Sequence, residues 1–398
     1  MFKNLNTPGV LQITALIITL LVDLQVYTVL AYWLKIKILL GIVILHKRTL
    51  TYYQAINEAQ DQSLARDSSV YLIGLGVPDK IGVFGTTKGL QEKYGKDRVY
   101  DAPISENALT GIAIGSSLNG MRPVMCHNRF EFALLAMEQI VNQAAKWYYM
   151  FDGQASVPLT IRLIVGRGWG QGPQHSQSLH AWFAHIPGLK IVLPVTPYDA
   201  KGLLATAIAD NNPVICVEHR WLHNLADHVP EEYYTIPIGL PRIVLPGKHI
   251  TVVAISYMVI EAIKAARQLH TEGIEVEVID VRSIAPLQYD MIYQSVAKTN
   301  CLMVCDHASY TGSFAGEIIA KVTENCFSDL HKPPVRIALP DCPLPTTRAL
   351  ANHYYPTAKN IIYQIKKILG EKIPIKQGYN IQATDLYDVP DKTFSGPF

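Results

Sequence analysis

From residue 48 to about residue 370, short apolar runs alternate with stretches in which apolar residues recur every three or four positions. The runs predict buried strands, and the longer period predicts helices that bury one face. In the first half the predicted strands cover residues 69–74, 99–104, 122–126, 157–165, 189–193 and 214–218. The predicted helices run through 55–64, near Leu90, after Ser105, and over 130–149 and 198–209. This alternation implies a parallel sheet with helices on both faces.

A second unit of the same kind begins near His249, after an irregular linker over residues 221–241. Its predicted strands cover residues 251–256, 276–281, 302–306 and 335–339, and its helices lie near 260–269, 289–297, 314–324 and 356–369. We therefore expect an α/β protein with two doubly wound domains. They are predicted to span residues 48–235 and 236–372, followed by a tail over 373–398.

Residues 1–47 do not follow this pattern, because 9–45 are almost entirely apolar. Their length suits a membrane anchor, although Asp23 in the middle would cost a few kcal/mol at the bilayer centre. The basic residues on the C-terminal side are Lys35, Lys37, Lys47 and Arg48. They would leave the two domains cytoplasmic if the segment spans a membrane. The alternative is an extension that the working protein does not use.

The composition argues against two classes of function, nucleic-acid binding and metal binding by paired cysteines. The chain has 398 residues and a formal net charge of +2, with no basic run interleaved with aromatic residues, so nucleic-acid binding is not expected. The six cysteines are scattered and show no paired metal-ligand spacing. They are interpreted as reduced core thiols of a cytosolic protein.

The first candidate site residue is Glu106, which follows the predicted strand 99–104 and begins a helix with Ser105 as its N-cap. The carboxyl end of a parallel strand is where α/β proteins bind ligands. Gly111 and Gly115 share one face of this helix and allow another helix to approach closely. The alternative is a first-turn acid that stabilises the helix dipole, combined with ordinary helix packing.

A second candidate region is the loop over residues 166–177, which is too rich in glycine for regular structure and too polar for the core. It carries His175, and His180 follows it. A histidine on a functional loop is suited to proton transfer, so we favour a functional role for His175. For His180 we favour a simple hydrogen-bonding role.

The segments PISENALTGIAIG, FEFALLAMEQIVNQAAK, PQHSQSLHAWFAHIPGLKIVLP, DAKGLLATAIADNNPV and DVRSIAPL carry a resemblance to a known family. Residues 50 to 370 resemble the beta subunit of the first component of 2-oxo acid dehydrogenase complexes of the pyruvate, branched-chain or acetoin type. These subunits belong to the transketolase-like thiamine diphosphate enzymes. The resemblance implies a pyrimidine-binding domain followed by a transketolase C-terminal domain. The family's usual glutamine at the end of the glutamate motif is Leu118 here.

The resemblance also implies roles for individual residues. Glu106 would pair with N1′ of the cofactor's aminopyrimidine and promote loss of the thiazolium C2 proton. Phe130, one of an aromatic pair with Phe132, would offer a ring to the pyrimidine. His175 would bind substrate or assist acyl transfer. His127 and His307 are weaker candidates for the substrate pocket.

A structural potassium ion is implied as well. The residues that match the main-chain potassium ligands of some relatives are Leu159, Ala207, Ile208, Asp210 and Asn212. Such a cage depends on the path of the backbone more than on side chains.

One family element is missing, because no Gly-Asp-Gly motif for the diphosphate and magnesium occurs in the chain, and 151–153 comes nearest. A magnesium–diphosphate site needs a near-octahedral set of oxygen ligands. We therefore expect half an enzyme. An alpha subunit would hold Mg²⁺ and the diphosphate, a second beta subunit would pair with this one, and a lipoyl-bearing acyltransferase would accept the acyl group.

Two loops depart from the family pattern. Residues 74–79 lack an acidic pair, and 166–174 carries Arg167 and Trp169 where relatives have a smaller, neutral run. The leading hypothesis remains a beta subunit that decarboxylates a 2-oxo acid. A split transketolase-like ketol or aldehyde transferase is the first alternative, because Arg167 suits an anionic acceptor. A non-catalytic regulatory subunit is the second.

Overall fold

The computed structural model describes residues 48–168 and 171–371. The apolar segment over 1–47 and the tail over 373–398 lie outside the described residues, as does Trp169. Within the part of the chain that the structure describes, no helix is long and apolar enough to cross a membrane. The membrane-anchor interpretation, the unused-extension interpretation and the cytoplasmic location stay predictions.

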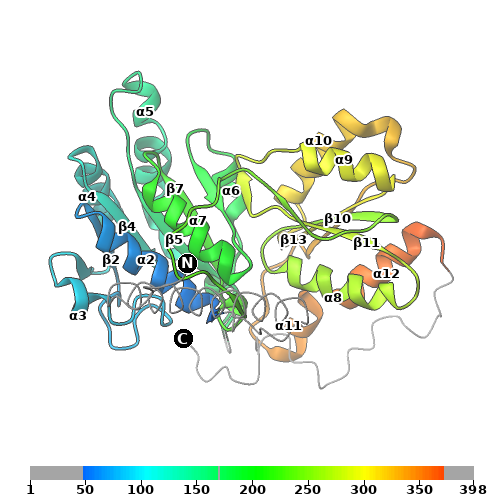
Figure 1. The fold of residues 1–398 in the computed structure, drawn as a ribbon, viewed down its shortest axis with the longest axis horizontal. Coiled ribbons are helices and arrows are strands. Elements are labelled where there is room, and N and C mark those ends of the chain that lie inside the picture. The colour runs from blue at the N-terminus through cyan, green and yellow to red at the C-terminus, as the bar shows by residue number, and fades with distance from the viewer. Residues whose placement is uncertain (1–47, 169–170, 372–398) are drawn as a thin grey trace, which may run out of the picture. The chain divides into compact units, whose positions relative to one another are not determined.

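A seven-stranded sheet with the strand order β12-β6-β7-β5-β4-β2-β3 forms the centre of the first domain (Figure 1). Its strands are β2 (Val70–Gly74), β3 (Val99–Asp101), β4 (Arg122–His127), β5 (Thr160–Val165), β6 (Lys190–Val192), β7 (Val214–His219) and β12 (Ser283–Ala285). All neighbours pair in parallel except β12, which pairs antiparallel with β6. The predicted parallel α/β architecture is thus confirmed.

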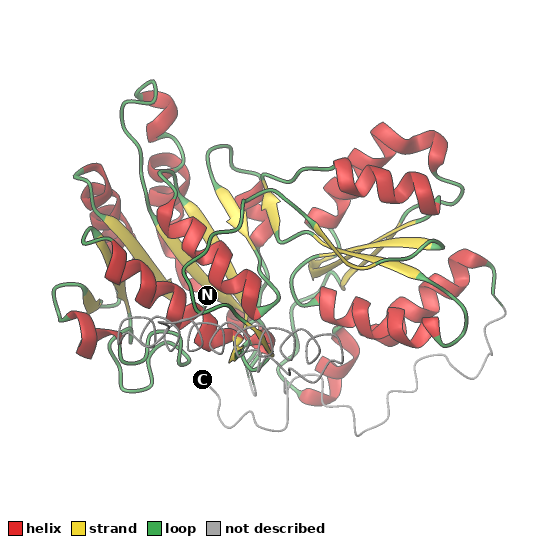
Figure 2. Ribbon diagram, in the orientation of Figure 1, coloured by secondary structure: helices red, strands yellow, loops and turns green. Residues whose placement is uncertain are grey.

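The helices of this domain cover both faces of the sheet (Figure 2). They are α2 (Tyr52–Arg66), α3 (Leu90–Tyr94), α4 (Glu106–Leu118), α5 (Trp147–Met150), α6 (His180–Ala184) and α7 (Pro197–Ala209). Successive residues of a strand point to opposite faces. Accordingly, Leu72 of β2 belongs to one hydrophobic core with α2 and α7, whereas its neighbour Ile73 belongs to the other core with α4. A capping box between Thr51 and Gln54 begins α2.

The second domain is built on a five-stranded sheet of order β14-β13-β10-β11-β9. Its strands are β9 (Arg242–Leu245), β10 (Ile250–Ala254), β11 (Val276–Asp280), β13 (Leu302–Ser309) and β14 (Val335–Leu339). Its helices are α8 (Met258–His270), α9 (Asp290–Thr299), α10 (Phe314–Cys326), α11 (Arg348–Tyr354) and α12 (Ala358–Leu369). Helices α9 and α10 lie on one face, and α8 and α12 lie on the other (Figure 2).

Two short pairings were not predicted. Strand β1 (Thr49–Thr51) pairs antiparallel with β8 (Ala226–His228), and β12 of the second domain extends the first sheet at β6. Each of the strands β1, β8 and β12 has three residues, which is too short for an apolar run to reveal it. The two domains are therefore joined by backbone hydrogen bonds as well as by side chains. The domain boundary at residues 235 and 236 stays a prediction.

The long helix predicted over 130–149 is wrong in its geometry. The chain there forms a 3₁₀ helix η1 (Phe130–Ala136), a π helix η2 (Gln139–Ala144) and the short α5. A 3₁₀ helix has three residues per turn, so positions i, i+3 and i+6 share a face. The residues on the buried face are Phe130, Ala133 and Ala136. The 3₁₀ winding of η1 therefore determines which of the two phenylalanines, Phe130 or Phe132, faces the candidate active site.

Candidate active site

Glu106 is the first residue of α4, at the carboxyl edge of the first sheet. The strand before it ends at Asp101 rather than Ile104, and Ser105 occupies the N-cap position without a side-chain hydrogen bond. Glu106 is half-buried in a small cleft. Apolar and sulfur-containing side chains dominate the lining, which includes Ile73, Leu109, Met125, Cys126 and Phe132. No described residue donates a hydrogen bond to the carboxylate, so its oxygens remain available to a ligand.

Gly74 allows strands β2 and β4 to meet closely beneath this cleft. A Cβ atom at Gly74 would lie 2.3 Å from the carbonyl oxygen of Cys126, a distance that real Cβ contacts do not show. The close approach brings Cys126 and His127 of β4 to the floor beside Glu106. Burial lowers the pKa of His127 to about 4, so its imidazole is neutral at physiological pH. His127 therefore lines the cofactor cleft as a neutral group.

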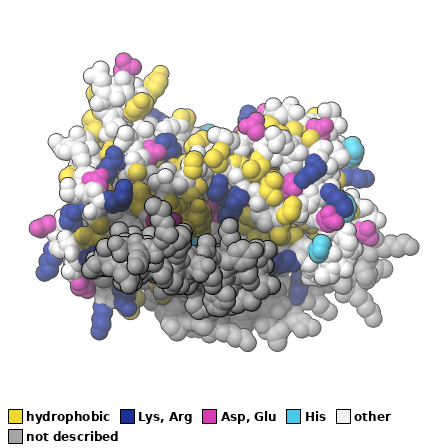
Figure 3. Space-filling view, in the orientation of Figure 1, with side chains coloured by type: hydrophobic (Ala, Val, Ile, Leu, Met, Phe, Trp, Pro, Cys, Tyr) yellow, Lys and Arg dark blue, Asp and Glu magenta, His cyan; other side chains and the backbone are white. Residues whose placement is uncertain are grey.

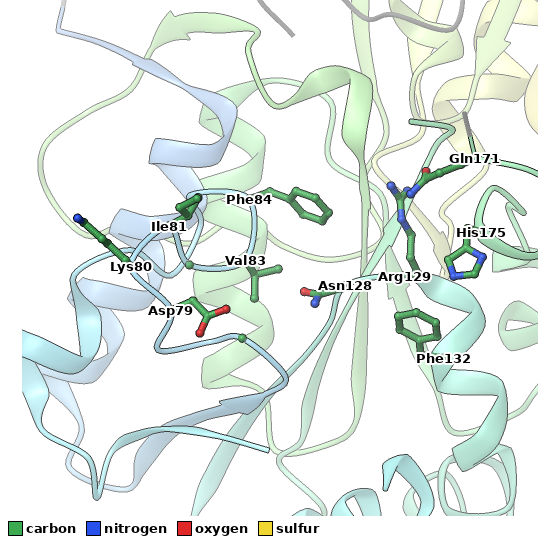
Figure 4. A pocket seen from close by; sticks show the side chains of 12 residues that line it. Asp79, Lys80, Ile81, Val83, Phe84, Asn128, Arg129, Phe132, Gln171 and His175 are labelled. Carbon is green, nitrogen blue, oxygen red and sulfur yellow. The ribbon is translucent and has the colours of Figure 1, made fainter. Parts of the chain in front are cut away.

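A larger cavity of about 590 Å³ adjoins the Glu106 cleft. Residues 76–84 line one side, and Arg129, Gln171 and His175 line the other (Figure 4). Asn128 and Phe132 line both the cavity and the Glu106 cleft. The two spaces are therefore contiguous around these residues.

His175 ends a short 3₁₀ turn, η3 (Pro173–His175), and its side chain is exposed toward the cavity (Figure 4). The imidazole contacts the edge of the Phe132 ring, with the two ring centroids 5.6 Å apart. Phe132 also lines the cleft that holds Glu106. The structure thus brings Glu106 and His175, the predicted acid and the predicted histidine, to two sides of the Phe132 ring.

Phe130, by contrast, does not line either space. Its side chain is fully buried and packs against Phe183, with ring centroids 5.3 Å apart. The 3₁₀ winding of η1 turns Phe130 into the core and Phe132 toward the cavity. The structure therefore corrects the assignment of the ring that faces the site from Phe130 to Phe132. Both phenylalanines were visible in the sequence, but an ordinary helical period could not distinguish them.

The remaining candidate histidines connect the two domains. His180 of α6 donates a hydrogen bond from Nε2 to Oδ1 of Asp306 in β13, over 2.9 Å. His307 Nδ1 lies 3.1 Å from Nε2 of His219, and burial lowers the pKa of His307 to about 3. Neither His180 nor His307 lines the cavity. For His180 this agrees with the hydrogen-bonding interpretation, whereas for His307 it corrects the expected place in the cleft.

Arg167 holds the glycine-rich loop in place and does not line the cavity. Its side chain is buried, and it donates hydrogen bonds to the carbonyl oxygens of Gln171 and Thr346. The indole of Trp221 donates to the carbonyl oxygen of Arg167 itself, over 2.7 Å. These bonds fix the loop that carries His175 against the second domain.

A buried ion pair between Arg162 and Glu218 stabilises the opposite wall of the cavity, which residues 76–84 form. The guanidinium of Arg162 binds both carboxylate oxygens of Glu218, at 2.5 and 2.8 Å. It also donates to the side-chain oxygens of Gln60 and Thr86, both at 2.8 Å. Thr86 follows two residues after Phe84, the last residue of the segment that lines the cavity. This network, which satisfies the buried charges, therefore also holds the wall in place.

The five predicted potassium ligands gather around the loop between α7 and β7 and the start of β5. The main-chain oxygens of Ile208 and Asp210 accept hydrogen bonds from Arg122, at 3.3 and 2.9 Å. Lys190 pairs with the Asp210 carboxylate at 2.5 Å. A carbonyl oxygen has two lone pairs, so these contacts leave room for a second partner. The potassium site stays a prediction.

No side-chain metal site is evident elsewhere. Across residues 48–168 and 171–371, no group of three or more His, Cys, Asp or Glu side chains could hold a metal ion. The six cysteines are free thiols, and five of them are buried.

Comparisons with known proteins agree with this geometry. The family model described as "Transketolase, pyrimidine binding domain" matches residues 48–224, and "Transketolase, C-terminal domain" matches residues 240–361. A solved structure described as a split gene transketolase, inactive beta4 tetramer, has a TM-score of 0.65 and 21% identity, over 81% of this chain and 99% of that chain. This likeness shows the fold.

Two curated relatives are similar along most of the sequence. The beta subunit of acetoin:2,6-dichlorophenolindophenol oxidoreductase from Bacillus subtilis (strain 168) is 41% identical over 336 residues, covering 81% of this chain and 98% of the relative. The mitochondrial pyruvate dehydrogenase E1 component subunit beta of Mus musculus is 41% identical over 326 residues, covering 81% and 91%. The chain therefore belongs to the family of E1 beta subunits of 2-oxo acid dehydrogenase complexes, built from the transketolase pyrimidine-binding and C-terminal domains.

Proposed function

We propose that this chain supplies the pyrimidine half of a thiamine diphosphate site in an enzyme that decarboxylates a 2-oxo acid and passes the acyl group to a lipoyl carrier. One observation carries the proposal. The unpartnered carboxylate of Glu106 lies in an apolar cleft that is contiguous with the cavity of His175. A carboxylate and an imidazole on two sides of one space suit successive proton transfers.

Thiamine diphosphate, when bound, supplies a thiazolium carbon that becomes nucleophilic after loss of its proton. In the proposed arrangement Glu106 holds a proton between its carboxylate and N1′ of the aminopyrimidine. Phe132 offers the ring face that the sequence interpretation gave to Phe130. His175 moves a proton at the oxygen of the substrate carbonyl or at the acceptor sulfur. The apolar lining of the cleft strengthens the electrostatic interactions of Glu106.

The proposed partner is an alpha subunit that carries the diphosphate and Mg²⁺ ligands. A Cβ atom at Gly115 of α4 would meet no atom of this chain within 4 Å, which is consistent with a face left open for another subunit. Ile112 on α4 and Leu135 on η1 are large apolar side chains exposed to solvent in this chain. Exposed apolar groups of this kind mark protein contacts. A second beta subunit and a lipoyl-bearing acyltransferase are proposed as further partners.

Apolar side chains also reach the surface at α5 (Figure 3). Tyr149 is 87% exposed, and Tyr148, Met150 and Phe151 are exposed beside it. This projecting group offers a second apolar contact to the proposed assembly.

The alternatives lose their support. The split transketolase interpretation relied on Arg167 as a site for an anionic acceptor, but that side chain is buried and bonds to the carbonyl oxygens of Gln171 and Thr346. A purely regulatory subunit has no need of Glu106 and His175 on contiguous spaces. The relatives at about 40% identity are E1 beta subunits.

The proposed function predicts the outcome of a direct assay. The purified pair of this chain and its alpha subunit should turn over a 2-oxo acid with a lipoamide acceptor, and should show no turnover of sugar phosphates in its place. Each substrate is tested with the same enzyme preparation, and the Glu106→Gln variant gives the background. Turnover confined to sugar phosphates would establish the transketolase-like alternative. Absence of both, in a pair that binds the cofactor, would favour a regulatory subunit.

A further inference from the structure

The cavity contains a buried cation that the proposed cofactor chemistry does not use. Arg129 precedes η1, and its side chain is only 3% exposed although it lines the cavity (Figure 4). One Nη1–H group donates to the carbonyl oxygen of Gly166 over 2.6 Å. On the other side, the guanidinium carbon lies 5.7 Å from the centroid of the Phe84 ring. These two contacts hold the guanidinium at the wall of the cavity.

The charge of Arg129 has no ion-pair partner among the described residues. Glu131 is the acid whose charge acts most strongly on Arg129, but the two side chains form no ion pair, and the Glu131 carboxylate accepts the backbone N–H of Gln177 over 2.6 Å. Asp79 lines the opposite wall and is exposed to solvent, which screens it (Figure 4). Burial lowers the pKa of Arg129 to about 10, so the group stays protonated at neutral pH. A buried unpaired charge is costly unless a ligand satisfies it.

The surroundings of Arg129 also favour an anion. The guanidinium carbon of Arg220 lies 4.5 Å from the centroid of the same Phe84 ring. Burial, and after it the positive charge of Arg129, lowers the pKa of Arg220. The amide side chains of Asn128 and Gln171 line the cavity with Arg129. A guanidinium has five N–H donors in a planar fork that matches carboxylate and phosphate oxygens. The hydrogen bond from Arg129 to Gly166 uses one of these donors.

The chemistry of decarboxylation determines which negatively charged group Arg129 can bind without slowing the reaction. The carboxylate that leaves as carbon dioxide loses its charge in the reaction. An ion pair to that carboxylate would stabilise the ground state more than the transition state and would slow the step. A negative group elsewhere on the substrate or acceptor keeps its charge throughout. Arg129 can bind such a group without opposing decarboxylation.

We propose that Arg129 forms an anion subsite in this cavity and selects a substrate or acceptor with a second, retained negative group. The proposal rests on the proposed function for the reaction itself. The anionic group is either the distal carboxylate of a dicarboxylic 2-oxo acid or the phosphate of a phosphorylated 2-oxo acid. Both present oxygens that the guanidinium fork can bind in two places.

The test uses the assembled alpha–beta enzyme and compares 2-oxoglutarate with 2-oxobutyrate, which lacks the distal carboxylate. The variants are Arg129→Gln and Arg129→Lys, with Lys80→Gln as a control that removes an exposed cation from the same cavity. The wild-type preference for the dicarboxylate, as a ratio of kcat/KM values, should fall about tenfold or more in Arg129→Gln. Arg129→Lys should recover part of the preference, and Lys80→Gln should keep the ratio of the wild type.

A second arm identifies the source of the anion and separates this proposal from the proposed function. Calorimetry measures binding of glutarate and of inorganic phosphate to the same enzyme, with butyrate as the singly charged control. Binding of glutarate indicates a dicarboxylic substrate, and binding of phosphate alone indicates a phosphorylated 2-oxo acid. In either case Arg129→Gln should abolish binding. If thiamine C2 exchange is normal but neither probe binds in an Arg129-dependent way, the subsite is refuted while the proposed function stands. If exchange is absent, the proposed function fails and calorimetry alone decides the subsite.

Discussion

The Glu106→Gln variant is expected to fold normally and to lose activation of the bound cofactor. Glutamine has nearly the shape of glutamate, and no described residue hydrogen-bonds to the carboxylate, so little in the fold depends on its charge. The amide cannot share a proton with N1′ as a carboxylate can. Hydrogen–deuterium exchange at thiamine C2 in the assembled enzyme should slow by about 10²- to 10⁴-fold, the usual range for a positioned acid or base.

A matched control separates this role from a helix-dipole effect. Glu92 is also a first-turn acid, on α3, but it is exposed and lines neither the cleft nor the cavity. In the Glu92→Gln variant, thiamine C2 should exchange hydrogen for deuterium at the rate of the wild type. Near wild-type exchange in Glu106→Gln, with the cofactor bound, would show that the carboxylate has been assigned the wrong role.

The His175→Ala variant is expected to separate cofactor activation from the later steps. The imidazole lines the cavity beyond Phe132 and does not line the Glu106 cleft, so thiamine C2 exchange should stay close to that of the wild type. Turnover with the acyl acceptor should fall by about 10²- to 10⁴-fold, because a general acid–base group is lost. The measurements are C2 exchange and acyl transfer per bound cofactor on one preparation.

The control for this variant is His185→Ala, which removes an exposed histidine just after α6 that is not part of the cavity. It should transfer acyl groups as the wild type does. If His175→Ala instead loses the cofactor while turnover per bound cofactor is unchanged, His175 belongs to the cofactor site and has been misplaced on the substrate side.

The architecture and the two central residues were accessible from the sequence because they depend on local pattern. Largely apolar runs such as β5 and β10 are buried on both faces of their sheets, which makes them conspicuous. Glu106 was found because a strand end, a cap position and a helix start coincide within a few residues. His175 was found because its loop is too polar for the core and too rich in glycine for regular structure.

The residues that were missed or misplaced depend on winding and on distant contacts. Choosing Phe132 over Phe130 needed the 3₁₀ geometry of η1, which an apolar period of three or four residues does not reveal. Arg129 follows directly after Asn128 in the chain, but its unpaired charge emerges only when Gly166 and Phe84 are brought to it. The pairing of His180 with Asp306 joins positions 126 residues apart in different domains. Such contacts are set by the packing of the sheets.

The central claim is that this chain holds half of a thiamine diphosphate site, and calorimetry on the isolated chain with Mg²⁺ present tests it most directly. A cofactor held only at its pyrimidine end, in water, should bind weakly or not at all. Adding a chain that carries Gly-Asp-Gly and a later asparagine should restore both binding and turnover. Tight stoichiometric binding together with decarboxylase activity in the isolated chain would contradict the account.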